Sequence, residues 1–234
     1  MGTGWGWLAV FEGAGCVAFD INGTLVDGVY RRWEWVFEAG LGLRRRVDGP
    51  GLRWYEVQTG RLSFEEAVSA SYVVSGEEEW ETGSIREEAF RVYLEGLRLR
   101  EGCLGLLEAL QGRFDLVVCS DTSGVTKVIA REFGLDKYFT RFYYSIDVGW
   151  LKSDRNFWHA FLAGYPGRRP EEFVMVGDNP RCDVHWPRVL GLGTIQVETT
   201  ELLSEESLII RDEFDRPDLR VTSLDEVARA LLVL

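Results

Sequence analysis

The sequence predicts an α/β protein in which a doubly wound parallel sheet forms the core and an all-helical segment is inserted after the first strand. Two observations predict this fold class. Short apolar runs that end in polar turns alternate with helical patterns, as βαβ units do. One long stretch near the start of the chain contains only helical patterns. The 234 residues are enough for one such core and one smaller insert.

Four short apolar runs are typical of buried parallel strands. Each run ends at a polar or glycine-containing turn, and parallel strands bring their carboxyl ends to the same edge of a sheet. We therefore expect the functional residues to lie in these turns. The four runs are Cys16–Phe19, Leu116–Cys119, Phe173–Val176 and Thr194–Val197.

Helical patterns predict the connections between these strands. The end of the chain, residues 219–232, predicts a last strand followed by a closing helix. The three connecting helices are expected at Gly102–Leu110, Val125–Phe133 and Arg155–Ala163.

The stretch from residue 28 to residue 99 differs because no strand-like run occurs in it. Ser63 and Ser84 each precede acidic residues in a pattern typical of helix N-terminal caps. We therefore expect residues 28–99 to form a helical domain, and residues 1–27 and 100–234 to form the sheet domain. The helical patterns are Tyr30–Ala39, Trp54–Thr59, Phe64–Val74 and Ile85–Leu97.

Tryptophan is concentrated in this insert. For these residues we favour a packing role over an aromatic wall that selects a substrate. They are Trp33, Trp35, Trp54 and Trp80.

Composition limits the partners and the compartment. The net charge of −12 argues against nucleic acid and anionic membranes, which bind cationic surfaces. No run approaches the roughly 20 apolar residues of a membrane span, and the first residues lack a secretory signal pattern. The four cysteines show no CxxC spacing, and Cys16 and Cys119 lie in apolar runs. We expect a cytoplasmic protein with buried, reduced thiols, and no pattern indicates an oligomeric state.

Asp20 follows the first strand and begins a turn that contains glycine. Backbone N–H groups in such a turn can surround an anion. A carboxylate there can attack phosphorus and form an acyl phosphate, which divides one displacement into two steps. An ordinary Asx turn would use the same residue types, so the other motifs have to decide between the two interpretations.

Three further motifs follow in order along the chain. Ser120 ends the second strand, and Lys152 precedes the helix at Arg155–Ala163. Lys152 is one of only three lysines, so its position carries more information than that of one of the many arginines. Asp178 follows the third strand in a Gly-Asp pair, with Asp183 five residues further on.

In this order the four motifs resemble those of the haloacid dehalogenase (HAD) superfamily, in its phosphatase-like branch. The first run, residues 17–27, is similar to the family pattern of apolar strand, Asp, any residue, Asp, Gly and Thr. The resemblance implies a Rossmann-like core, a helical cap that closes over the active site, a Mg²⁺ cofactor and a small-molecule phosphate ester as substrate.

The resemblance also implies a role for each matching residue. Asp20 would be the nucleophile, Thr24 would support its loop, and Ser120 and Lys152 would hold the phosphoryl group. Mg²⁺ would be bound by Asp20, Asp178 and the backbone carbonyl of Asn22, with Asp183 holding waters or supporting the loop. Gly23, Asp121 and Thr122 are the candidate substrate-binding residues, and Asp121 stands where many relatives carry asparagine.

Asn22 departs from the family pattern, because phosphatases of this family carry aspartate at this position. That aspartate protonates the leaving oxygen and later activates water, a contribution of about 10²–10⁴-fold. Three interpretations follow: a slow phosphatase or one for substrates with good leaving groups, a phosphate-ligand-binding or regulatory protein, or an engineered change that traps an intermediate.

A 2-haloacid dehalogenase is a further alternative, since that branch also lacks the second acid. Its members usually lose the Gly-Asp metal pair, whereas Asp178 and Asp183 are present here and favour phosphate chemistry. The two histidines, His159 and His185, are too scattered to predict a histidine-centred site, and for both we favour a packing or surface role.

Overall fold

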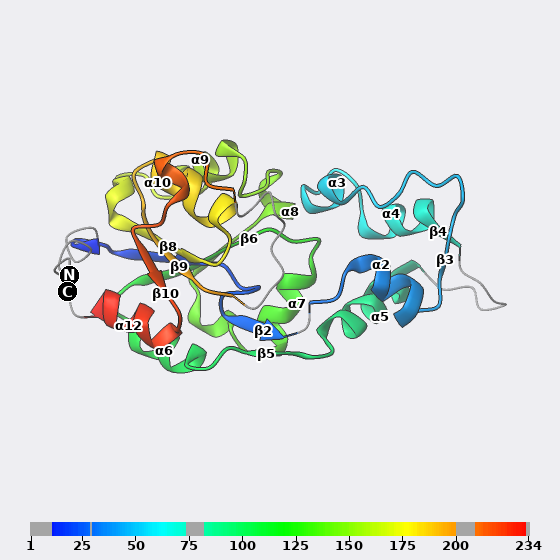
Figure 1. Cartoon of the computed structure of the whole chain (residues 1–234), viewed down its shortest axis with the longest axis horizontal. Helices are drawn as coiled ribbons and strands as arrows, with labels where there is room; N and C mark the ends of the chain where they lie inside the picture. The colour runs from blue at the N-terminus through cyan, green and yellow to red at the C-terminus, as the bar shows by residue number, and fades with distance from the viewer. Residues whose placement is uncertain (1–10, 29, 74–81, 200–208, 233–234) are drawn as a thin grey trace.

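A computed structural model gives the fold and describes residues 11–28, 30–73, 82–199 and 209–232 (Figure 1). Six parallel strands form the main sheet in the order β10-β9-β8-β1-β6-β7. The order reverses around β1: the chain first builds outward through β6 and β7, then returns to β1's other side. The strands are β1 (Cys16–Phe19), β6 (Asp115–Ser120), β7 (Arg141–Tyr144), β8 (Phe173–Gly177), β9 (Gly193–Val197) and β10 (Leu219–Val221).

The four predicted core strands and the final strand are confirmed, and the doubly wound parallel sheet with them. The strand β7 was not predicted. It lies at the edge of the sheet, and Arg141 and Phe142 are exposed there. A strand buried on one side only lacks the continuous apolar run that marks the central strands.

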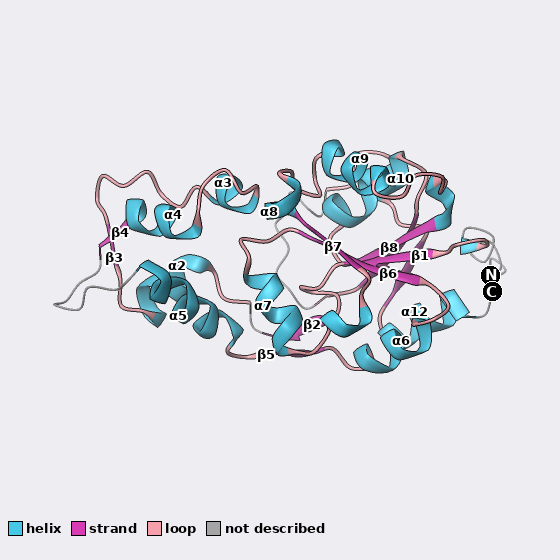
Figure 2. Cartoon of the chain, turned by 180° about the vertical axis from the view of Figure 1, so that it is seen from behind, coloured by secondary structure: helices cyan, strands magenta, loops and turns pink. Residues whose placement is uncertain are grey.

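Helices cover both faces of the sheet, as Figure 2 shows from behind. One face packs on the helices α9 and α10, and the other on α6, α7 and α12. The helices of this half are α6 (Cys103–Leu110), α7 (Val125–Glu132), α8 (Ser145–Val148), α9 (Arg155–Ala163), α10 (His185–Val189) and α12 (Leu224–Leu232). Four short turns of helix are η2 (Asp136–Tyr138), η3 (Pro170–Glu172), η4 (Pro180–Val184) and η5 (Glu213–Asp215).

The insert forms a separate group of helices at one end of the molecule (Figure 1). Its helices are α2 (Trp33–Trp35), η1 (Val36–Gly40), α3 (Trp54–Gln58), α4 (Phe64–Ser71) and α5 (Thr82–Leu94). The expectation of a wholly helical insert needs correction at two short strand pairings, and the expected helix Ile85–Leu97 ends at Leu94, before β5 (Leu97–Leu99). After α4 the chain forms β4 (Tyr72–Val73), which pairs antiparallel with β3 (Arg44–Arg45). The predicted helix Phe64–Val74 is therefore shorter, and Val74 lies outside the described residues. Two-residue strands are too short to leave a period in the sequence.

The expected boundaries of the insert fall on a second short pairing. β2 (Val26–Gly28) and β5 (Leu97–Leu99) run antiparallel, so the chain leaves and re-enters the sheet half side by side. Gly28 has φ of 133°, and a Cβ there would lie 2.2 Å from the carbonyl oxygen of Gly96. The close approach of these two strands therefore requires glycine.

Aromatic side chains form the core of the insert. The Trp33 ring stacks on Tyr93 with centroids 4.7 Å apart, and Phe37 is fully buried beside it. The packing role is therefore confirmed for Trp33 and for Trp54, whose rings lie 5.3 Å apart. Trp35 instead is 41% exposed and stacks under the guanidinium of Arg31. Trp80 lies outside the described residues.

The two cysteines in apolar runs are buried, as expected. Cys16 and Cys119 are buried free thiols, and burial raises the pKa of Cys16 to about 12. Among the described residues, no helix combines the length and the apolar character that crossing a membrane requires.

Candidate active site

The nucleophile candidate, Asp20, lies directly after β1, where the strand order reverses. Ligands of open α/β sheets bind at such reversal points, outside the carboxyl ends of the strands. Asp20 is only 8% exposed, and its Oδ1 accepts a hydrogen bond of 2.7 Å from the backbone N–H of Ile21. The neighbouring strands β6 and β8 end beside β1 and bring their own polar residues to this place.

Lys152 joins two carboxylates that are far apart in the sequence. Its Nζ lies 2.6 Å from Oδ2 of Asp20 and 2.6 Å from Oδ1 of Asp183, and the lysine is 1% exposed. Burial alone would lower the pKa of Lys152. The charges of Asp183 and Asp20 outweigh burial and raise that pKa well above its usual value, so the buried ammonium stays protonated.

Asp178 and Asp183 complete a group of three acids. Carboxylate oxygens of Asp20, Asp178 and Asp183 all lie within 4.8 Å of one another, and all three side chains are buried. Burial raises the pKa of Asp183 to about 6, while the charge of Lys152 opposes this rise. Three carboxylates and one ammonium leave an excess of negative charge in a buried place, which favours a cation.

The residues fit a Mg²⁺ ion on the chemistry of the donors. Mg²⁺ prefers oxygen ligands, takes one or two carboxylates and keeps several waters. The turn that carries these oxygens is fixed by Gly177, because a Cβ there would lie 2.3 Å from the carboxylate carbon of Asp183. The N–H of Asn179 donates to Asp183 Oδ2 at 2.9 Å. The acid can therefore approach only because position 177 has no side chain.

Asn22 turns toward the start of α7. Its Nδ2 donates to the hydroxyl of Thr126 at 3.2 Å, and its Oδ1 is buried and accepts no hydrogen bond within the described structure. Thr126 is fully buried, and its N–H donates to Thr122 Oγ1 at 3.1 Å. The amide thus offers one buried acceptor that no described group uses, and it has no proton that it could give and take back.

The second predicted motif lies beside the first. Ser120 is the last residue of β6 and is 1% exposed. Asp121 accepts a hydrogen bond of 2.8 Å from the backbone N–H of Lys152, which ties this turn to the lysine turn. Burial raises the pKa of Asp121 to about 6. Thr122 is 2% exposed, and its hydroxyl accepts from the N–H groups of Gly124 and Thr126, so it holds the start of α7.

The loop after Asp20 is held by contacts on both sides. Gly23 has φ of 74°, a left-handed conformation that suits glycine. Its N–H donates to the hydroxyl of Tyr30 at 2.8 Å, and its carbonyl accepts from Arg100 Nη1 at 2.9 Å. Thr24 is fully buried, with its hydroxyl 3.4 Å from Asp178 Oδ1. Thr24 thus connects the loop after Asp20 to the acid that follows β8.

Sequence reasoning missed several residues that position this site. Trp158 donates from its indole nitrogen to the carbonyl of Lys152 at 2.7 Å, and Gln196 donates to the carbonyl of Asp178 at 3.1 Å. Gln196 could have been predicted from the sequence, since it is a polar residue within an apolar strand. No local pattern marks Thr126 or Arg100, because their contacts depend on elements that meet only in three dimensions.

A cleft of about 830 Å³ separates the insert from the sheet half. Phe64, Phe90 and Leu94 line it from the insert, and Ser123 and Ile146 line it from the other side. The three clustered carboxylates are not among its lining residues, but Ser123 is only three residues past Ser120. The insert also touches the sheet half directly, since a Cβ at Gly60 would lie 2.5 Å from the carbonyl oxygen of Ile146.

The fold and this group of residues define a class of protein, and a family model agrees. Residues 15–185 match the model described as haloacid dehalogenase-like hydrolase. The chain belongs to this family. The matched range begins just before β1 and ends just after Asp183, so it contains all four motifs and the insert.

Individual relatives share only part of this sequence. The chain is 26% identical over 145 residues to YfnB of Bacillus subtilis, named as a HAD-hydrolase, and 36% identical over 94 residues to a phosphoserine phosphatase of Thermus thermophilus. These matches cover 60% and 40% of this chain and only 62% and 34% of the relatives. A solved structure of YfnB bound to magnesium matches with a TM-score of 0.60 at 19% identity, over 93% of this chain and 98% of that one.

Proposed function

We propose that this protein is a Mg²⁺-dependent phosphohydrolase that acts on a small phosphorylated molecule through an aspartyl-phosphate intermediate. The observation that carries the proposal is the group of Asp20, Asp178 and Asp183, of which Asp20 and Asp183 contact the Lys152 ammonium. This group lies at the carboxyl ends of adjacent strands, where open α/β sheets bind ligands. The phosphatase relative from Thermus thermophilus and the magnesium-bound YfnB structure support the same chemistry.

The nucleophile is Asp20. Its Oδ1 is fixed by the N–H of Ile21, and its Oδ2 lies against Lys152. In the first step Oδ2 or Oδ1 attacks phosphorus, the bond to the leaving oxygen breaks, and the phosphoryl group is carried by Asp20. In the second step water attacks this phosphorus and releases phosphate, which restores the carboxylate.

Positive charge has to balance the carboxylate and the incoming phosphate. Lys152 supplies one fixed charge. We assign the hydroxyl of Ser120, the last residue of β6, to donate to a phosphoryl oxygen. Asp20, Asp178 and the carbonyl of Asn22 would hold Mg²⁺, with Asp183 supporting it. When bound, the ion supplies Lewis-acid polarisation of the phosphate.

Asn22 determines which substrates turn over well. Without an acid at this position the leaving oxygen departs as an anion, which is tolerable for an acyl phosphate or phosphoanhydride and slow for an alkyl ester. The helical insert, residues 28–99, is proposed as the cap that covers the site. A phosphate-binding or regulatory role is the second candidate function, and the absence of the acid at position 22 favours it.

The test compares the native protein with Asn22→Asp. Phosphate release is measured with and without Mg²⁺, on acetyl phosphate and on a panel of phosphomonoesters. The acid should raise monoester turnover by about 10²-fold or more and acetyl phosphate turnover much less, because only the monoester needs a proton on its leaving group. Asp20→Asn is the matched control and should be inactive on both.

Three results would count against the proposal. Activity that persists in Asp20→Asn would contradict the assignment of Asp20 as the nucleophile. Activity that is unchanged by chelation would contradict the dependence on Mg²⁺. If neither native protein nor Asn22→Asp turns over any substrate while phosphate still binds, the regulatory role replaces hydrolysis.

A further inference from the structure

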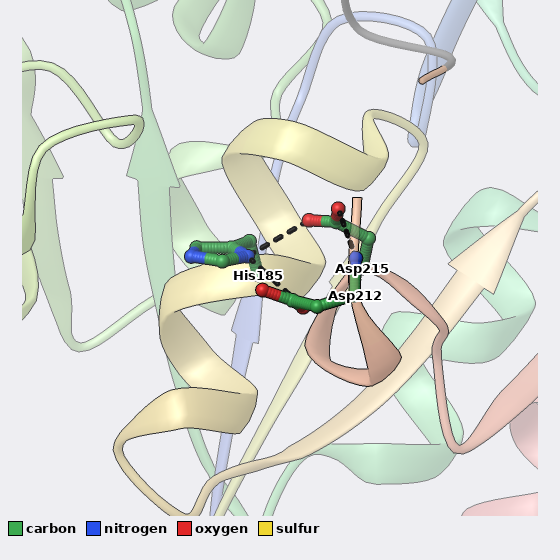
Figure 3. Close-up of side chains that lie close together, drawn as sticks. All are labelled: His185, Asp212 and Asp215. Carbon is green, nitrogen blue, oxygen red and sulfur yellow. Dashed lines mark hydrogen bonds and ion pairs between the residues drawn. The ribbon is translucent and has the colours of Figure 1, made fainter. Parts of the chain in front are cut away.

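A second group of metal-binding side chains lies outside the proposed active site. His185 is the first residue of α10, Asp212 immediately precedes η5, and Asp215 ends η5. The imidazole Nδ1 of His185 lies 2.8 Å from Asp215 Oδ1 and 4.0 Å from Asp212 Oδ1. One ligand atom from each residue lies within 4.8 Å of the others, and Figure 3 shows both carboxylates turned toward the imidazole.

The backbone holds the two carboxylates in this arrangement. Asp215 is only 7% exposed, and its far oxygen, Oδ2, accepts from the N–H groups of Arg211 at 2.6 Å and Asp212 at 3.4 Å. Its Oδ1 is thereby left facing His185. Asp212 Oδ1 accepts from the N–H of Phe214 at 2.8 Å. Oriented ligands of this kind bind metal with less reorganisation than free side chains do.

The ionisation of the group also suits a cation. Burial opposes the ionised form of Asp215, but hydrogen bonds, first among them the one from the backbone N–H of Arg211, hold its pKa below the usual value. Asp212 is exposed, so water can complete the coordination of an ion. The two separations from Nδ1, 2.8 Å and 4.0 Å, lie on either side of the roughly 3.3–3.6 Å between neighbouring ligands of a tetrahedral ion with bonds of about 2.0–2.2 Å.

We propose that His185, Asp212 and Asp215 bind a borderline divalent transition metal ion of the zinc class, at a site distinct from the three buried aspartates. The ligand chemistry separates the two sites. One nitrogen and two carboxylate oxygens suit Zn²⁺ and its neighbours, whereas the all-oxygen group of Asp20, Asp178 and Asp183 suits Mg²⁺.

An ion at this site would connect two distant parts of the chain. His185 follows η4, the turn that carries Asp183, and is two residues from that acid. Asp212 and Asp215 belong to the segment that leads into β10. The ion would therefore cross-link this segment to the turn behind the active site, and its role is structural.

The experiment measures Zn²⁺ affinity of the full-length protein by competition with a chromophoric chelator, with Mg²⁺ in excess to occupy the buried aspartates. His185→Gln should bind Zn²⁺ about 10- to 100-fold more weakly than the native protein. The matched control is His159→Gln, which removes the chain's other imidazole from an exposed position on α9 and should leave the affinity unchanged.

Two further variants keep the test decisive. Asp212→Asn removes one exposed ligand while leaving the contact between His185 and Asp215, so it should weaken Zn²⁺ binding without unfolding the protein. Asp178→Asn disables the other site and should keep the Zn²⁺ affinity. The proposal is overturned if Zn²⁺ affinity is the same in His185→Gln, Asp212→Asn and the native protein, or if Asp178→Asn alone abolishes it.

Discussion

The two halves of this molecule bury different kinds of side chain. In the sheet half, the turns that follow β1 and β8 bury Asp20, Asp178 and Asp183, and one ammonium contacts Asp20 and Asp183. In the insert, the buried centre is aromatic, with Trp33 and Phe37 at its middle. Burial of charge costs stability unless each charge is paired, whereas burial of aromatic area stabilises directly.

This difference indicates that the two halves have different roles, with the candidate active site in the sheet half. The sheet half buries several charges at a cost in stability. Buried ionisable groups with shifted pKa values that lie together are typical of a functional site. The insert has an ordinary core and contributes a wall of the cleft. Substitutions in the sheet half should therefore change both chemistry and stability, and substitutions in the insert core should change stability first.

Lys152→Met should have the largest effect. It leaves Asp20 and Asp183 buried without their shared partner, which should cost about 3–5 kcal/mol in the free energy of unfolding and abolish phosphate release. The control is Lys127→Met, because Lys127 pairs with the exposed Asp147 and such pairs contribute about 0–1 kcal/mol. Urea unfolding measures both variants, and equal losses would contradict the assignment of Lys152 as the central charge.

Phe37→Ala tests the stability that the aromatic core of the insert contributes. Removing this fully buried ring should cost about 3 kcal/mol in unfolding free energy, while the Mg²⁺ affinity of the folded protein stays unchanged. Trp35→Ala is the comparison, because Trp35 is 41% exposed and should cost less than about 1 kcal/mol. Mg²⁺ titration of both variants checks the second statement, and a large loss of Mg²⁺ affinity in Phe37→Ala would show that the halves are coupled.

Gly177→Ala is expected to have a smaller effect on stability and a clear effect on the metal site. The new Cβ meets the carboxylate of Asp183, and such overpacking costs about 1–3 kcal/mol. Gly105→Ala is the matched control, since it lies in α6 with nothing within 4 Å of a Cβ and should stabilise by about 0.5–1 kcal/mol. If both variants bind Mg²⁺ like the native protein, the turn around Asp183 is not part of the metal site.

The smallest effect is a pH dependence at Asp121. Burial raises its pKa to about 6 in the folded state, above the usual value of about 3.9 in the unfolded chain. The folded state therefore binds more protons between these values, and Asp121 contributes stability at low pH that is lost as pH rises through about 6. Asp121→Asn should become more stable relative to the native protein across pH 4 to 7, by about 2 kcal/mol. Melting temperatures that differ by a constant amount over this range would contradict the shift.

Local sequence patterns were sufficient for the central part of the fold. The strands at Cys16–Phe19 and Phe173–Val176 were predicted because a strand buried on both faces must be apolar throughout. The helix at Arg155–Ala163 was predicted with the same bounds that the structure has. The edge strand β7 and the short pairs β3–β4 and β2–β5, of two and three residues a strand, were missed, since short or half-exposed strands leave no distinct period.

By itself, the sequence determined the order of the strands' polar turns and the residue types in them, because each motif is a short run whose chemistry is set by covalent neighbours. Tertiary structure alone decided which of these residues meet. The 2.6 Å contacts of Lys152 join positions 132 and 31 residues apart, and the group of His185, Asp212 and Asp215 forms only when η5 packs beside α10. Contacts of this kind depend on packing between distant segments, and no local pattern encodes that packing.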